Sequence, residues 1–443
     1  MENNTVKPEK FAQSITIKGL IIGALTLLLL IPGIMIQGLI LERKNTSEEA
    51  IAKINAKWSQ AQTLSGPILT IPYTATTVEQ NGKQKMAQNE IHFTPDILKI
   101  DAELYPETRY YGIYKTILYR SEINISGEFG FVDFESVIDG TADLKKACLR
   151  FGLSDLKGIA ENIEFTINGK RFTAEVAGDR DNNLEKILVV TIDDAELLKS
   201  DEKIRFSSKI FLKGSSNINF IPVGKTTTVE VRGKWASPGF IGSFSPDSEI
   251  EDGKFTAKWN ILHFNRSIPD VWTNKNVDSF RDTSFGVNLV ETVDHYQQNM
   301  RSAKYALMFI ALTFVVFFFV EILTHKRIHP IQYLLVGIAL ILFYSLLLSL
   351  SEQLNFALAY FIASVATIGL ITAYAYSIFK NKIQTGILTI ILTGLYAFLY
   401  VILQLEDRAL MIGSIGLFLI LAVIMYISRK ISWYKPGKEE NTV

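Results

Sequence analysis

The sequence predicts a membrane protein in which one N-terminal and five C-terminal transmembrane helices flank a large, mainly-β domain. An apolar run occupies residues 19–41, and residues 303–427 form a series of apolar runs separated by short polar breaks. Between them the spacing of apolar residues changes from helical to about two, which is typical of strands. The hydrophobic content of 48% and the mean hydropathy of +0.20 exceed those of most soluble multidomain proteins.

Charge and cysteine content narrow the class of protein further. The chain holds 45 basic and 45 acidic residues, so its formal net charge is zero. A nucleic-acid-binding protein concentrates Lys and Arg on one face, and we therefore expect no nucleic-acid partner. Cys148 is the only cysteine, so no intrachain disulfide can form and an exported domain must be stable through its core alone.

The N-terminal segment predicts an uncleaved membrane anchor. Residues 1–18 are a polar tail with three lysines, and the apolar run 19–41 is long enough to cross a hydrocarbon core of about 30 Å. A cleaved signal peptide has a shorter apolar region, of about 7–15 residues, that ends in small residues. This run is longer and is followed by Glu42 and Arg43.

The segment after the anchor predicts a short amphipathic helix near residues 46–60. Thr46 and Glu49 have the spacing of a capping box, in which both side chains bind free backbone N–H groups at a helix start. Ile51, Ile54 and Trp58 follow at helical spacing. We expect this helix to lie on the membrane or on the domain that follows.

The domain at residues 42–302 is predicted to be mostly antiparallel β-structure, in the form of a sandwich of two sheets. Strands are expected at residues 68–73, 117–126, 163–167, 186–192 and 226–232, where β-branched and aromatic residues alternate with polar ones. Two Asn-Gly pairs, at residues 81–82 and 168–169, predict tight hairpin turns. Short helices are expected near residues 141–150 and 193–199.

From Val287 the pattern becomes helical again and runs without a break into the next predicted span. The five C-terminal spans are predicted at residues 303–323, 331–350, 356–379, 386–405 and 409–427, followed by a tail at residues 428–443. With the anchor this makes six spans, which return both termini to the same side.

Loop charges predict the orientation. The tail at 1–18, the connections at 324–330 and 380–382, and the C-terminal tail at 428–443 carry most of the Lys and Arg next to the spans. Cytoplasmic loops have this excess. We therefore expect both termini in the cytoplasm and the β domain on the outer side.

Polar residues at the outer ends of the C-terminal spans form the candidate site. They are Glu352, Gln353, Gln404, Glu406, Asp407 and Arg408. Ionisable groups at a membrane are costly and often functional, so this rim is a candidate site for a lipid headgroup, an ion or a lipid-linked substrate. The alternative is that these are interfacial turn residues, with Arg408 paired to a neighbouring acid.

Catalytic and metal-binding motifs are weak. Glu321, His325 and His329 are spaced four apart, which would place them on one helical face as a metal set, but they adjoin a basic turn that ends in Pro330. The sequence contains no Gly-x-Ser-x-Gly or His-Glu-x-x-His string. We expect no catalytic residue, resident metal or cofactor, and Cys148 is expected to be a small buried residue.

Several long strings carry a family resemblance. They lie at residues 64–73, 112–114, 285–289, 304–314, 329–337, 348–352 and 403–407. These strings, in this order, resemble the CreD family of bacterial inner-membrane proteins. The resemblance implies an inner-membrane protein of Gram-negative bacteria. It also implies a role in cell-envelope integrity, linked to two-component signalling, envelope stress, the β-lactam response and colicin tolerance, and it implies no established enzyme activity.

The leading hypothesis is therefore a non-catalytic envelope-integrity protein whose periplasmic domain is a sensor or scaffold. Its expected partners are the lipid bilayer, a membrane or periplasmic protein, and a lipid or lipid-linked ligand. Two alternatives stay open: a transporter or flippase of an envelope lipid precursor, suggested by the acidic rim, and a metal-dependent membrane enzyme, suggested by Glu321, His325 and His329.

Overall fold

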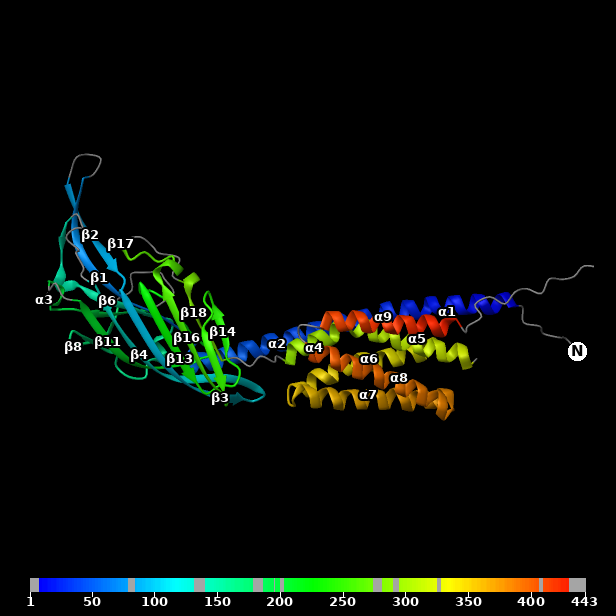
Figure 1. The fold of residues 1–443 in the computed structure, drawn as a ribbon. Helices are drawn as coiled ribbons and strands as arrows, with labels where there is room; N and C mark the ends of the chain where they lie inside the picture. The colour runs from blue at the N-terminus through cyan, green and yellow to red at the C-terminus, as the bar shows by residue number, and fades with distance from the viewer. Residues whose placement is uncertain are drawn as a thin grey trace, which may run out of the picture. The chain divides into compact units, whose positions relative to one another are not determined.

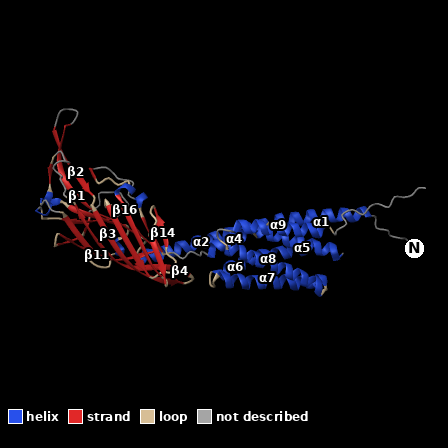
Figure 2. Ribbon diagram, viewed as in Figure 1, coloured by secondary structure: helices blue, strands red, loops and turns tan. Residues whose placement is uncertain are grey.

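A computed structural model describes residues 8–78, 84–130, 140–177, 186–194, 196–199, 203–273, 281–289, 295–324, 328–405 and 409–429. The chain forms two compact units. Residues 1–47 and 293–443 form one, and residues 48–292 form the other. Helices build the first unit and strands dominate the second (Figures 1 and 2). The large β domain predicted from the sequence is thus confirmed.

The strands of the β domain form two sheets. The path of the larger one is β14 (Gly239–Gly242), β18 (Phe285–Asn288), β12 (Asn217–Phe220), β1 (Gln62–Val78), β6 (Cys148–Leu153), β10 (Lys186–Thr191) and β9 (Glu175–Val176). Off this path, β2 (Gln84–Phe93) and β5 (Thr141–Ala142) pair with β1, and β17 (Val271–Thr273) pairs with β2. The order of the smaller sheet is β15 (Asp247–Glu251), β16 (Lys254–Leu262), β13 (Thr226–Gly233), β3 (Ile97–Tyr111), β4 (Tyr114–Phe129), β11 (Ile204–Ser215), β7 (Glu164–Ile167) and β8 (Lys170–Thr173).

Alternating side chains place one face of each sheet on a shared core. In β3, Leu98, Ile100 and Ala102 are almost fully buried, whereas Lys99 and Asp101 between them are exposed. Buried residues of both sheets belong to the same hydrophobic cluster. Most strand pairs are antiparallel, but β1 pairs parallel with β12 and β13 pairs parallel with β3. The mixed pairing is the main departure from the predicted antiparallel sandwich.

Residues with positive φ form a hairpin turn between β7 and β8 and a bulge in β1. Asn168 and Gly169 have φ of 44° and 84° and connect β7 to β8, so this predicted hairpin is confirmed. Residues 81–82 lie outside the described residues, although β1 and β2 pair antiparallel on either side of them. Gly66 has φ of 95°, and a Cβ there would lie 2.7 Å from the Arg150 carbonyl oxygen, so only glycine fits this bulge in β1.

The helix expected near residues 141–150 is wrong. This stretch holds β5, the 3-10 helix Leu144–Lys146 and the start of β6. Leu149 pairs with β1 and β10 and is fully buried, so sheet pairing decided its conformation. The second expected helix exists as the short α3 (Glu196–Lys199). Further 3-10 helices lie at Leu156–Gly158, His263–Asn265 and Arg281–Thr283.

The anchor and the amphipathic helix, predicted as separate, form one nearly continuous helix. α1 (Pro8–Leu28) and α2 (Leu30–Trp58) are interrupted only at Leu29. Pro32 has no N–H to donate to the carbonyl of Leu28, which explains a local break at this point. Because no helix starts at Thr46, the predicted capping box is wrong, and the Thr46 hydroxyl instead donates to the Glu42 carbonyl at 2.9 Å.

The expected unbroken run from Val287 into the next span is also wrong. Val287 lies in β18, and two helices follow, α4 (His295–Lys304) and α5 (Ala306–Thr324). These two helices meet at an angle of 45° around Tyr305. The polar residues of α4 therefore belong to the helical unit and not to the β domain, contrary to the predicted boundary at residue 302.

Four further helices complete this unit: α6 (Pro330–Ser351), α7 (Phe356–Phe379), α8 (Lys382–Gln404) and α9 (Ala409–Ser428). α6 contacts α1, α4, α5 and α7. α8 begins four residues before the predicted residue 386, because the Asn381 side chain caps it by accepting from the Ile383 N–H at 2.9 Å. Among the described residues, four helices are long and apolar enough to cross a membrane, or five if α4 and α5 form one bent span, and α9 contributes a shorter apolar stretch.

The last turn of α2 is held on the outer face of the smaller sheet. The Thr116 hydroxyl donates to the Asn55 side chain at 2.8 Å. Around the Trp58 ring lie the cationic groups of Arg109, Arg120 and Lys213, at 5.0, 5.8 and 5.0 Å from its centroid. Hydrogen bonds and cation–π contacts thus fix the helix end to β3, β4 and β11.

Candidate functional sites

The predicted rim residues are only partly brought together. Glu352 follows α6, and its side chain is 10% exposed. Its Oε1 accepts from the Tyr296 hydroxyl at 3.3 Å and lies 3.8 Å from Arg43 Nε. Gln353 and Gln404 are exposed at the ends of α6 and α8. The other three members, Glu406, Asp407 and Arg408, lie outside the described residues.

Sequence reasoning missed the polar face that α4 brings to Glu352. The Asn299 side chain donates to the Ser351 hydroxyl at 2.7 Å, and Ser351 precedes Glu352 in the chain. Gln298, Asn299 and Ser302 are 9, 2 and 0% exposed. Their helical spacing was a visible signal, but the predicted domain boundary assigned them to the β domain. We call Gln298, Asn299, Ser302 and Glu352 the α4–α6 oxygen cluster.

The proposed metal set does not form in the described part of the chain. Glu321 forms an ion pair with Lys18, accepts from the Tyr333 hydroxyl at 2.9 Å and accepts from the Ile328 N–H at 3.1 Å. His329 caps α6, with Nδ1 accepting from the Ile331 N–H at 3.3 Å. His325 lies outside the described residues, and those described contain no group of three or more His, Cys, Asp or Glu side chains placed to bind a metal.

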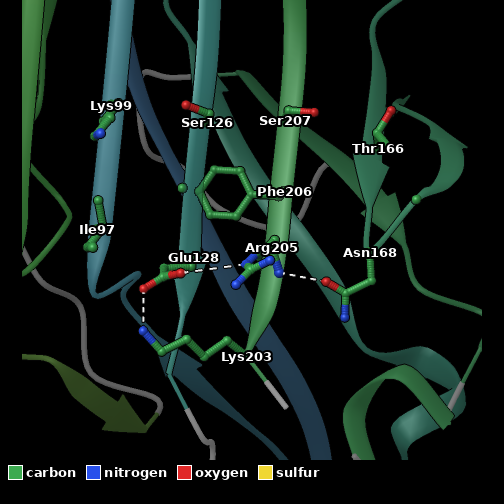
Figure 3. A pocket seen from close by; sticks show the side chains of 12 residues that line it. Ile97, Lys99, Ser126, Glu128, Thr166, Asn168, Lys203, Arg205, Phe206 and Ser207 are labelled. Atoms are coloured by element: carbon green, nitrogen blue, oxygen red, sulfur yellow. Dashed lines mark hydrogen bonds and ion pairs between the residues drawn. The ribbon is translucent and has the colours of Figure 1, made fainter.

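The β domain carries an open groove on the outer face of its smaller sheet (Figure 3). Its volume is about 900 Å³. Lys99, Ser126, Ser207 and Thr166 form a row across four neighbouring strands, since each is paired in register with the next. Because these residues occupy outward positions of the strands, they present an amine and three hydroxyls to the groove.

A second row of the groove concentrates charge. Lys203 Nζ lies 2.5 Å and Arg205 Nε lies 3.8 Å from carboxylate oxygens of Glu128 (Figure 3). The Lys99 amine has no ion-pair partner among the described residues. Two cations thus lie beside the Glu128 carboxylate and Lys99 adds a third in the other row, so the groove has an excess of positive charge that suits an anionic ligand. Sequence reasoning missed it because its residues come from strands far apart in the chain.

A partly buried polar cluster lies on the outer face of the larger sheet. His92 Nδ1 lies 2.9 Å from the Thr70 hydroxyl, and Arg150 forms an ion pair with Glu90 at 2.7 Å. Burial, assisted by Arg150, lowers the pKa of His92 to about 4. Burial also raises the pKa of the Cys148 thiol, which is 7% exposed. This thiol is therefore protonated at neutral pH, as expected of a small buried residue.

Fold and sites together define the class of protein. Large apolar side chains are exposed on the helices, among them Leu20, Met35, Phe361 and Phe418 at 71, 69, 64 and 70%. Such a surface is typical of helices in contact with lipid. The chain is thus a membrane protein in which an N-terminal apolar helix and several C-terminal apolar helices flank a large, mainly-β domain.

Comparison with known proteins gives the family. The model of the family described as "Inner membrane protein CreD" matches residues 14–434, and the chain belongs to this family of inner membrane proteins. It is 29% identical over 428 residues to the inner membrane protein CreD of Escherichia coli strain K12, and the match covers 94% of each chain.

Solved structures add no functional information. An M1 zinc metallopeptidase from Deinococcus radiodurans, crystallised as a point mutant, matches 38% of this chain and 38% of its own at 11% identity, with a TM-score of 0.20. The same enzyme without this mutation matches with a TM-score of 0.19 at 10% identity, again over 38% of each chain. These scores are too low to support a common fold or activity.

Proposed function

We propose that this protein is a non-catalytic inner membrane protein that supports cell-envelope integrity and the envelope-stress response, and that its β domain acts in the periplasm as a sensor or scaffold. The observation that carries this proposal is the groove of Figure 3, an open, positively charged surface lined by hydroxyls. Such a surface can bind an anionic envelope component without transforming it, because it presents binding groups but no activated nucleophile among the described residues.

The junction with α2 supports a sensor or scaffold role for the same sheet. Thr116, beside Asn55, and Ser126, in the groove, lie on one strand, β4. Ten residues of strand correspond to about 33 Å. A ligand that changes the twist of β4 at the groove therefore acts on the surface to which the end of the anchor helix is fixed.

The proposed topology has six spans, cytoplasmic termini and a periplasmic β domain. The Lys and Arg of the short connections support it, as does the series of apolar helices. Because Cys148 is the only cysteine, single cysteines can be introduced into a Cys148→Ala protein. A cysteine at the exposed Lys254 should react with an impermeant maleimide in intact cells, and one at Lys438 should react only after lysis. The reverse pattern would refute the topology.

The functional test is complementation of a deletion strain. We expect the wild-type gene to restore β-lactam tolerance and envelope-stress signalling, and a Lys99→Ala/Arg205→Ala double variant to fail at equal membrane abundance. Lys254→Ala is the matched control, since it removes an exposed strand lysine outside the groove. Full complementation by the groove variant would reject the groove as the functional surface, and a deletion without phenotype would reject the envelope role.

The transport hypothesis has its own test. Reconstituted protein should move an envelope lipid precursor across vesicles, and Glu352→Ala should abolish this movement if the rim takes part. If the wild-type protein moves no lipid precursor across the vesicle membrane, the transport hypothesis is rejected.

A further inference from the structure

Three buried oxygen atoms on α4 lack a partner among the described residues. Gln298 Oε1, Asn299 Oδ1 and Ser302 Oγ are each buried, and none accepts or donates a hydrogen bond within that part of the chain. They lie within two turns of α4, at positions whose spacing places Asn299 and Ser302 on the same face. A buried polar atom without a hydrogen bond costs about 1–3 kcal/mol of folding free energy, so three of them within two turns of one helix require an explanation.

The orientation of the Asn299 amide shows what kind of group is missing. Its Nδ2 donates to the His295 carbonyl at 2.8 Å and to the Ser351 hydroxyl at 2.7 Å. The His295 carbonyl oxygen can accept a hydrogen bond only from the NH₂ group of the Asn299 amide. The amide oxygen of Asn299 is therefore the atom that lacks a partner. The unpartnered oxygen atoms of this face are thus the amide oxygens of Gln298 and Asn299 and the hydroxyl of Ser302, and the group that they lack must offer positive charge or hydrogen-bond donors.

A loosely compensated carboxylate follows α6, beside the residue that Asn299 contacts. Glu352, next to Ser351, is 10% exposed, and it pairs with Arg43, whose Nε is 3.8 Å away and whose side chain is half exposed. That distance is too long for a hydrogen bond. One carboxylate together with neutral oxygens balances a single positive charge, whereas divalent sites commonly recruit several carboxylates.

We propose that the α4–α6 oxygen cluster is a binding site for a monovalent metal cation such as sodium. Hard cations prefer oxygen ligands of this kind, namely carboxylate, amide carbonyl and hydroxyl. The site is independent of the groove in the β domain, and neither proposal requires the other. Three of its four ligands are neutral Gln, Asn and Ser side chains. Metal sites are usually recognised by clusters of His, Cys, Asp and Glu, and this site contains only one such residue.

The direct test is binding of radioactive sodium to the full-length protein, purified in choline chloride and measured by scintillation proximity. We expect saturable binding that unlabelled sodium competes and choline does not. Ser302→Ala and Asn299→Ala should each weaken it by about tenfold or more, because each removes one ligand. Ser377→Ala, which removes the hydroxyl of an exposed serine on α7, is the matched control and should leave binding unchanged.

A variant that should bind sodium more tightly distinguishes an effect on the site from an effect on folding, because misfolding can only weaken binding. Gln298→Glu has nearly the same shape as the wild type, and its extra carboxylate should tighten sodium binding severalfold. Absence of saturable binding in the wild type, or binding that neither alanine variant weakens, would show that only water fills the cluster and would overturn the proposal. A fall in affinity with Gln298→Glu would overturn it too.

Discussion

Lys18 on α1 and Glu321 on α5 form an ion pair inside the helical unit, although 303 positions separate them in the sequence. Their side chains are 20% and 9% exposed. The Tyr333 hydroxyl and the Ile328 N–H also donate to Glu321, so this carboxylate connects α1, α5 and the start of α6. The buried negative charge of Glu321 is tolerated because one of its partners is a cation and the other two are hydrogen-bond donors.

Removing one member of this pair should destabilise the helical unit. Glu321→Gln leaves the Lys18 ammonium without its counter-charge, and breaking a buried pair costs about 3 kcal/mol or more. The double variant Lys18→Met/Glu321→Met should recover much of this loss, because it removes both charges. Thermal denaturation of the detergent-purified protein, followed by size-exclusion chromatography, measures the effect.

The control for this cycle is the exposed pair of Glu49 and Lys53. Its side chains are 73% and 77% exposed and 3.9 Å apart, so Glu49→Gln should change the melting temperature very little. Equal losses for Glu321→Gln and for the double variant would show that Glu321 acts through packing and not through the charge of Lys18.

Trp58 should hold the end of α2 on the sheet through its ring. Replacing it with alanine removes the aromatic face shared by Arg109, Arg120 and Lys213. At about 0.5–1 kcal/mol for each cation, we expect a loss of about 2 kcal/mol in local stability. Hydrogen exchange should accelerate at residues 48–62 while the core strands stay protected.

Trp58→Phe keeps an aromatic face and should retain most of this protection, and Lys57→Ala, at the neighbouring exposed position, should retain all of it. If Trp58→Ala leaves exchange at residues 48–62 unchanged, two hydrogen bonds fix the helix end without the ring: that of Thr116 to Asn55, and that of the Gln62 amide, which donates to the Lys213 carbonyl at 3.1 Å.

His92 should make the β domain less stable in mild acid. Its pKa of about 4 in the folded protein lies below the ordinary value of 6.5. The unfolded chain therefore binds more protons between these two values, and stability is complete above pH 6.5 and falls as the pH drops toward 4. For a change from pH 7.5 to pH 5 we expect a loss of about 2 kcal/mol.

Urea unfolding followed by tryptophan fluorescence measures this effect, since Trp58, Trp235, Trp259 and Trp272 all lie in the β domain. His92→Gln removes the titrating group and should abolish most of the difference between pH 7.5 and pH 5. A variant with the same pH dependence as the wild type would assign the effect to other groups.

Local sequence patterns predicted those features that local forces determine. β13, which covers the strand predicted at residues 226–232, alternates in burial along its length, and Asn168 and Gly169 supply the positive φ angles of a hairpin, so each could be recognised from its own residues. Leu149 could not, because its strand depends on pairing with β1 and β10. The sites depend on such distant contacts even more. The row from Lys99 to Ser207 exists only once β3, β4 and β11 have aligned, and Asn299 meets Ser351 only through the packing of α4 on α6.

Arg266 should be a major source of stability in the β domain. Its side chain is fully buried; Nε donates to the Gly224 carbonyl at 2.9 Å, Nη2 donates to Asp270 at 2.7 Å, and Nη1 donates to the Ile268 carbonyl. Arg266→Met leaves the two carbonyls without donors, and we expect a loss of about 3 kcal/mol in the free energy of unfolding. Urea unfolding at pH 7.5 measures it.

The size of the loss should depend on the shape of the donor group as well as on its charge. Arg266→Lys keeps the charge but replaces a fork of donors with a single ammonium, so it should recover only part of the stability, because one ammonium cannot reach Gly224, Ile268 and Asp270 together. Arg232→Met is the matched control: its side chain is 51% exposed, its pair with Glu230 spans 3.3 Å, and an exposed pair contributes less than about 1 kcal/mol. If Arg266→Met cost no more than Arg232→Met, water would have to satisfy the carbonyls of Gly224 and Ile268, and the segment from Arg266 to Asp270 would owe its conformation to apolar contacts such as those of the buried Ile268.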